Sequence, residues 1–204
     1  MQIVAWAAFV ASLLCGVFRF TTGGYIYSAL ISGFCGVSAM LSGKHLLGLG
    51  LFMSVIADWF LCHQAGHSQR FLYGVAGFFI AHCLFAAYAF GRFSFSTAAI
   101  IVTSALLIGF GAYMLLRALP HIDAGLKLPV IAYVLVSILS LHAAFSMNAP
   151  TAEKILYIVG IAAIVFSDTM IAENIFVGVK QAGKLVHPTY YACHWLITLS
   201  ALIR

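Results

Sequence analysis

Two aspartates lie inside long apolar segments of this chain. Asp58 lies within LFMSVIADWFL and Asp168 within IVGIAAIVFSDTMIA, although the sequence holds only 5 acidic residues. A carboxyl group in a hydrocarbon environment is costly and usually marks a functional site. It must be protonated, paired or hydrogen-bonded. Two such groups close together disfavour each other's ionisation, so that one serves as an acid and the other as a base.

Further polar side chains occupy the neighbouring apolar segments. If successive segments alternate in direction, those that carry His82, Tyr133 and Tyr190 start from the face near which the two aspartates lie. At about 1.5 Å per residue, these groups fall in the same half of a bilayer. The sequence therefore predicts one polar cavity, in which the aspartates share a proton with each other or with His82. Two structural alternatives stay open, because tyrosines also anchor helices at the interface and a histidine also bonds a neighbouring helix.

The composition is that of an integral membrane protein. The 204 residues are 64% hydrophobic and 7% charged, with a mean hydropathy of +1.08, whereas a soluble domain is about 25% charged. The 10 Lys and Arg residues stand singly at segment ends, which argues against a nucleic-acid partner. The first apolar segment lacks a basic start, so we expect a spanning helix rather than a cleaved signal. In a bacterium the location would be the inner, or plasma, membrane.

Apolar segments of membrane-spanning length predict an all-α fold, a polytopic membrane protein with eight transmembrane helices. A helix needs roughly 17–25 residues to span. We expect one domain over 1–204, in which short loops make consecutive helices antiparallel neighbours. The segments are Gln2–Phe18, Tyr25–Leu41, His45–Cys62, Phe71–Phe90, Thr97–Leu119, Leu128–Met147, Ile155–Ala172 and Thr189–Ile203.

Five stretches, in the order ADWFL, GVAGFFIAHCLFAAYAF, LPVIAYVL, FSDTMIAENIF and TYYACHWLI, resemble the YhhN family of membrane proteins. The resemblance runs from the third segment to the end of the chain, and the first two segments carry no motif that matches. Phe85 departs from a position that is often Tyr in the family, and His194 from one that is often Gln. The family's polar positions fall on Asp58, His82, Tyr133, Asp168 and Tyr191.

The resemblance implies a lysoplasmalogenase, because the characterised animal members of the family hydrolyse the vinyl ether bond of lysoplasmalogens. Protonation of the vinyl carbon needs an acid that stays protonated near neutral pH, which a buried carboxyl group supplies. Asp58 and Asp168 would be the acid and the base, in an order that the sequence leaves open, with His82 as a relay. No cofactor is implied, and the lysophospholipid would enter sideways from the bilayer. The expected substrate-binding residues are Tyr133, Tyr190, Tyr191 and His194, with Lys180, Lys184 or Lys127 at the mouth for the phosphate.

Other functions remain as alternatives. A metal-dependent lipid hydrolase would use Asp58, His82 and further histidines as ligands, but the chain has no H-E-x-x-H motif and no G-x-S-x-G elbow. We therefore predict no metal. A proton-coupled transporter also uses intramembrane carboxylates, but no paired Gly or Pro interruption marks a broken helix. A passive lipid-binding protein is the last alternative. The 5 cysteines include no C-x-x-C pair and are expected to be buried apolar residues.

Overall fold

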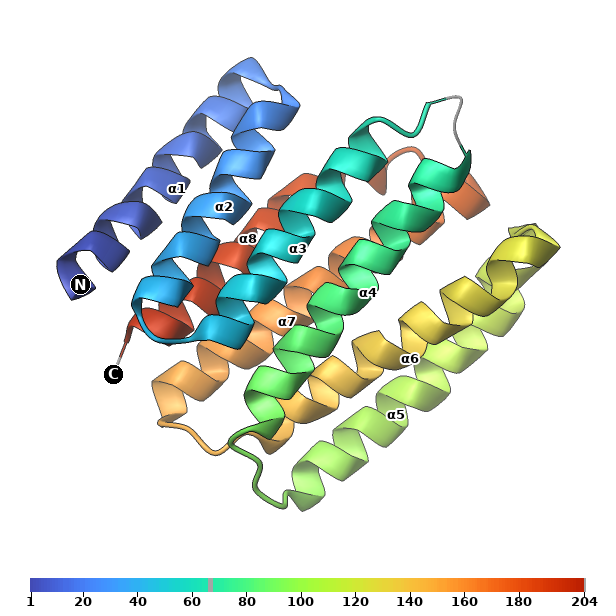
Figure 1. The fold of residues 1–204 in the computed structure, drawn as a ribbon. Helices are drawn as coiled ribbons and strands as arrows, with labels where there is room; N and C mark the ends of the chain where they lie inside the picture. The colour runs from blue at the N-terminus through green and yellow to red at the C-terminus, as the bar shows by residue number, and fades with distance from the viewer. Residues whose placement is uncertain (66–67, 204) are drawn as a thin grey trace.

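The computed structural model describes residues 1–65 and 68–203. Both chain ends lie at the same end of the helical bundle (Figure 1). Two π-helical segments, η1 (Met114–Ala118) and η3 (Glu173–Val177), prolong the fifth and seventh helices, and a 3-10 turn, η2 (Leu119–His121), follows η1. The described residues form α1 (Gln2–Thr22), α2 (Tyr25–Leu41), α3 (His45–Cys62), α4 (Ser68–Phe90), α5 (Thr97–Tyr113), α6 (Ala124–Ser146), α7 (Thr151–Ala172) and α8 (Gly183–Leu202).

Within residues 1–65 and 68–203, six segments are long and apolar enough to cross a membrane, which makes the chain an integral membrane protein. They correspond to α1, α3, α4, α5 with its continuation, α6, and α7 with its continuation. The predicted all-α fold with eight helices is confirmed, whereas eight spans are not established. The helix α2 has only 17 residues. The helix α8 is less apolar, because it carries polar side chains such as His194 and Thr198, which are buried against the other helices.

Most consecutive helices are neighbours, as expected, but α4 and α5 are an exception. Among the helices that follow it in the sequence, α4 packs mainly against α6. The helix α5 packs chiefly on the outer side of α6. Figure 1 shows α5 at the edge of the bundle, with α7 and α8 behind α2, α3 and α4. The helix α8 contacts α7, α2 and α1 and so closes the bundle.

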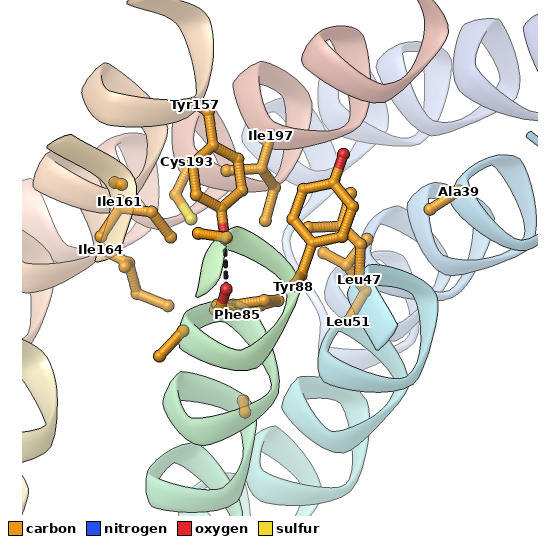
Figure 2. Packing of buried hydrophobic residues seen from close by; sticks show 14 of the residues in the cluster. Ala39, Leu47, Leu51, Phe85, Tyr88, Tyr157, Ile161, Ile164, Cys193 and Ile197 are labelled. Carbon is orange, nitrogen blue, oxygen red and sulfur yellow. Dashed lines mark hydrogen bonds between the residues drawn. The ribbon is translucent and has the colours of Figure 1, made fainter. Parts of the chain in front are cut away.

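The apolar interior lies where α3 and α4 meet α7 and α8. Figure 2 shows Ile161, Ile164 and Ile197 packed around the Tyr157 ring, which is fully buried. The Tyr157 hydroxyl donates a hydrogen bond of 2.7 Å to the main-chain carbonyl of Phe85 (Figure 2). A buried hydroxyl needs such a partner, because an unpaired one costs about 1–3 kcal/mol. This contact fixes α7 against α4.

A polar network at the opposite end of the bundle from η1 and η3 joins the loops after α4 and α6. The guanidinium of Arg92 donates to the Glu153 carboxylate over 2.6 Å and also to the Tyr88 hydroxyl. The amides of Ser94 and Asn148 bond to carbonyls across the two loops, at 2.7 and 2.6 Å. The network holds α4 beside α6 and α7, which brings the polar residues of these three helices together.

Candidate active site

Asp168 is the centre of a polar cluster that α4, α6 and α7 assemble. Its Oδ2 accepts a hydrogen bond of 2.8 Å from the Tyr133 hydroxyl and lies 3.2 Å from Nε2 of His82. The His82 side chain is fully buried, and that of Asp168 is 14% exposed. The structure therefore brings together three of the predicted site residues, which are far apart in the sequence. Of the two predicted partners for the proton of Asp168, His82 is the one in contact.

The hydrogen bonds around His82 assign its protons. Ser140 Oγ lies 2.8 Å from the carbonyl oxygen of Ser137, and because a carbonyl only accepts, the hydroxyl proton points there. His82 Nδ1, 2.9 Å from the same Oγ, then carries a proton and donates it. When a hydrogen bond joins the pair, Nε2 either accepts from a protonated Asp168 or, in an imidazolium, donates to the carboxylate. In both of these hydrogen-bonded states the pair holds one acidic proton.

An apolar cavity of about 80 Å³ adjoins this cluster. Asp168 and Tyr133 are the two members of the cluster that line it, and its walls are otherwise almost entirely hydrocarbon. Such a cavity suits an apolar chain that has one reactive polar group, because water is scarce around the acid. The remaining lining residues are Leu61, Phe71, Val75, Phe78, Phe110, Met114, Val130, Val134, Ser137, Val165, Thr169, Ile171, Ala172 and Phe176.

Asp58 belongs to a second cluster. Its Oδ2 accepts a hydrogen bond of 2.8 Å from the hydroxyl of Tyr190. No hydrogen bond joins its carboxyl group to that of Asp168 in the described residues, and Asp58 is not part of the cavity wall. The Tyr190 ring meets the ring of Phe78 edge-on at 5.7 Å, and Phe78 does line the cavity. The two aspartates thus have different hydrogen-bond partners, and the contact between Tyr190 and Phe78 connects the Asp58 cluster to the cavity wall.

His194 supports Tyr190 rather than facing the cavity. It is fully buried, its Nδ1 lies 2.8 Å from the main-chain oxygen of Tyr190, and its ring contacts the Tyr190 ring at 4.3 Å. Its Nε2 has no hydrogen-bond partner in the described residues. Lys180 and Lys184, predicted for the mouth, lie exposed between η3 and the first turn of α8. The structure shows no side-chain bond from either lysine to another described residue.

Arg19 is a site neighbour that the sequence analysis missed. The apolar segment Gln2–Phe18 predicts a helix that ends before Arg19, but α1 continues to Thr22 and carries Arg19 towards α8. Its Nε donates to the Tyr191 hydroxyl over 3.2 Å and to Ser28 over 3.0 Å, and its Nη2 lies 3.2 Å from Nε2 of His187. Tyr191 therefore lies in this cluster, next in sequence to Tyr190 but outside the cavity wall.

A third polar group, also missed, adjoins the cavity where η1 and η3 meet. Tyr113 donates a hydrogen bond of 3.1 Å to the Glu173 carboxylate, and Nε of Arg117 lies 3.6 Å from the same oxygen. As for metal sites, residues 1–65 and 68–203 contain no group of three or more His, Cys, Asp or Glu side chains placed to hold an ion.

Comparison with known protein families gives a match over most of the chain. The model of the YhhN family matches residues 17–201. The chain belongs to the YhhN family. No curated protein and no solved structure matches it. The YhhN match begins before the first recognised motif and includes α2 and the last turn of α1, so that Arg19 and Ser28 lie within the matched region.

Proposed function

We propose that this YhhN protein hydrolyses the vinyl ether bond of a lysophospholipid, which yields a fatty aldehyde and a glycerophospho-alcohol. The observation that carries the proposal is the contact of 3.2 Å between Asp168 Oδ2 and His82 Nε2 beside an apolar cavity, since such a pair can hold an acidic proton. Membership of a family that includes lysoplasmalogenases supports it.

The reaction needs one proton donor, one proton acceptor and one water. The Asp168–His82 pair delivers its proton to the vinyl carbon β to the ether oxygen, which leaves an oxocarbenium ion. Water adds to the carbon next to the oxygen as the Asp168 carboxylate takes up one of its protons. The hemiacetal then breaks its bond to the glycerol oxygen and gives the aldehyde and a free hydroxyl. One water is consumed, and the proton returns to the pair.

The other residues hold this pair and the substrate in place. Tyr133 orients the reacting oxygen of Asp168 by its hydrogen bond of 2.8 Å. Asp58 is assigned a positioning role, because it fixes the Tyr190 ring, which packs on the cavity residue Phe78. The sequence predicts that Asp58 and Asp168 are the catalytic acid and base. In the proposed mechanism Asp168 alone reacts, and Asp58 supports the site.

The membrane arrangement follows from the helices. We propose that α2 and α8 also cross the bilayer, which gives eight spans, because both pack along helices that are long enough to do so. The substrate's chain would then reach the apolar cavity from the bilayer itself. The substrate could therefore reach Asp168 without first leaving the membrane.

Substitution of the acid tests the proposal. We expect Asp168→Asn and His82→Gln to lower aldehyde release from a lysoplasmalogen by at least about 100-fold, since general acid catalysis contributes roughly 10²–10⁴. Asp123→Asn is the control, because Asp123 is exposed at the start of α6. The measurement is aldehyde formed by purified protein in lipid vesicles. A folded Asp168→Asn protein with the activity of the control would end the proposal.

A further inference from the structure

The polar group at the junction of η1 and η3 has a chemistry that the proposed reaction does not use. Glu173 is held by the Tyr113 hydroxyl at 3.1 Å and faces Nε of Arg117 at 3.6 Å. The hydrogen bond from Tyr113 and the ionic contact with Arg117 both involve one oxygen, Oε1. The other oxygen, Oε2, is buried and has no hydrogen-bond partner in the described residues.

An unpaired carboxylate oxygen in a protein interior calls for a donor. The Glu173 side chain is only 14% exposed, so bulk water satisfies it poorly. Leaving such a group unpaired costs about 1–3 kcal/mol or more for a charged acceptor. Arg117 does not supply the missing donor to Oε2, because its side chain is 58% exposed and its nearest nitrogen approaches the other oxygen, Oε1. The site therefore offers an unmet acceptor next to an exposed cation.

The surroundings connect this pair of charges to the cavity. Met114 at the start of η1 and Phe176 in η3 both line the cavity, as does Ala172, which precedes Glu173. Both segments are π-helical turns, which break regular helix geometry and occur frequently at functional sites.

The distance along α7 suits a lysophospholipid. Glu173 follows Asp168 by five residues, which is a rise of about 7.5 Å at 1.5 Å per residue. In a lysoplasmalogen, six bonds separate the vinyl ether carbon from the phosphorus, a length of the same order. With the vinyl ether at Asp168, the headgroup reaches the level of Glu173 and Arg117.

We propose that Arg117 and Glu173 bind a zwitterionic phosphoethanolamine headgroup, the guanidinium taking the phosphate and Oε2 the primary ammonium. The inference rests on the proposed function for the placement of the vinyl ether. A primary ammonium donates hydrogen bonds to a carboxylate. A trimethylated choline has no N–H to donate, so the site selects ethanolamine over choline. Arg117 takes the role for which the sequence suggested Lys180 and Lys184.

The test measures binding of lipids that the protein does not cleave. The ligands are 1-O-alkyl lysophospholipids with ethanolamine or choline headgroups, and a 1-O-alkylglycerol without phosphate. Binding to the purified full chain is followed by its intrinsic tryptophan fluorescence. We expect the wild-type protein to bind the ethanolamine lipid about 10-fold more tightly than the choline lipid. Equal affinity for the two overturns the proposal without any substitution.

Variants assign the preference to the two residues. Glu173→Gln should lose the preference for ethanolamine and leave the affinity for the choline lipid within about twofold. Arg117→Gln should weaken both phospholipids about 10-fold and leave the alkylglycerol unaffected. Arg70→Gln, which alters an arginine in the first turn of α4, is the control and should change none of the three affinities. A Glu173→Gln protein that weakens all three ligands equally, or none, overturns the assignment.

Two further comparisons separate the possible outcomes. Free phosphoethanolamine should bind far more weakly than the lipid, and equal affinity overturns a lipid headgroup as the source of the ligand. Selective binding by a wild-type protein that releases no aldehyde supports the headgroup site and ends the proposed function. Equal aldehyde release from both headgroups, together with a harmless Glu173→Gln, leaves the function standing and overturns the headgroup site.

Discussion

Asp58 and Asp168 look alike in the sequence, but their neighbours differ. Each lies near the end of an apolar helix and accepts a hydrogen bond of 2.8 Å from a tyrosine hydroxyl. Only Asp168 also contacts a histidine and lines the cavity. A similar position in an apolar helix therefore does not give equal roles, and the two residues should respond differently to the same substitution.

The first prediction compares Asp→Asn at the two positions. Asp58→Asn keeps an amide oxygen that accepts the Tyr190 hydroxyl, so we expect a folded protein that retains at least about a tenth of the wild-type rate, whereas Asp168→Asn loses the acid itself. The measurement is the initial rate of aldehyde release at equal folded protein. If a folded Asp58→Asn protein were as inactive as Asp168→Asn, Asp58 would be a second catalytic carboxyl and the positioning role would be wrong.

A second prediction concerns Tyr133. Tyr133→Phe removes the hydroxyl that donates to Asp168 and preserves the ring. A hydrogen bond to a charged group contributes about 1.5–3 kcal/mol, so we expect the rate to fall about 10- to 100-fold with little change in fold. Tyr73→Phe is the matched control, because Tyr73 is half exposed on α4. Rates that agree between the two variants would show that Asp168 is oriented without Tyr133.

At the residue scale, the sequence identified the polar groups inside apolar segments but not those at helix ends. Asp58, Asp168, His82 and Tyr133 stand out because a polar side chain is costly there. Arg19, Glu173 and Arg117 do not, since charges at segment ends are the ordinary interfacial pattern. Their contacts depend on how far each helix continues, which composition does not determine.

At the scale of helices, the loss of apolar character was a poor guide to where a helix ends. The helices α2 and α3 have the predicted bounds, but α1 runs to Thr22 rather than Phe18, and α7 starts at Thr151 rather than Ile155. Backbone hydrogen bonds continue through polar residues until a residue such as Gly23, with φ of 75°, ends the helix. The additional turn of α1 is what brings Arg19 to Tyr191.

Close packing of α3 and α4 gives a prediction at this scale. A Cβ on Gly77 would lie 2.9 Å from Cβ and 3.2 Å from Cα of Ala57, the neighbour of Asp58. Because the second contact is with the backbone, the helices must separate, and we expect Gly77→Ala to cost about 1–3 kcal/mol. Thermal unfolding in detergent would register this as a lower midpoint.

Gly109→Ala is the control for that substitution. Gly109 lies within α5 and nothing lies within 4 Å of its added Cβ. Alanine favours a helix over glycine by about 1 kcal/mol, so the midpoint should stay or rise. A Gly77→Ala protein that unfolds at the same temperature as Gly109→Ala would contradict the close contact of α3 with α4.

For the whole molecule, the sequence predicted the class of fold but not the order in which helices pack. Lipid hydrocarbon and the interior of a helical bundle are both apolar. The pattern of apolar residues therefore does not say which side of α4 meets lipid and which meets α6. The loop contacts at Arg92 and Glu153, which set this order, join segments far apart in sequence. The expected burial of all cysteines was wrong for the same reason, since Cys62 and Cys83 are exposed.

These two cysteines test the position of the molecule in the membrane. Cys62 ends α3, while Cys83 faces outward within α4, seven residues before its end at Phe90, which is about 10 Å at 1.5 Å per residue. Labelling requires the thiolate, which attacks the maleimide and does not form in hydrocarbon. We therefore expect a water-soluble maleimide to label Cys62 in open membrane fragments, and Cys83 only after detergent has replaced the lipid.

Variants that keep one cysteine and replace the other four by serine or alanine make the comparison direct. Cys35, fully buried in the bundle, is the control for protection by protein rather than by lipid. It should stay unlabelled in membranes and in a mild detergent that preserves the fold, whereas Cys83 should gain reactivity in that detergent as water reaches the rim of the micelle. Labelling of Cys83 in membranes as fast as that of Cys62 would place the outer side of α4 against water, and the lipid-facing surface would have to lie elsewhere.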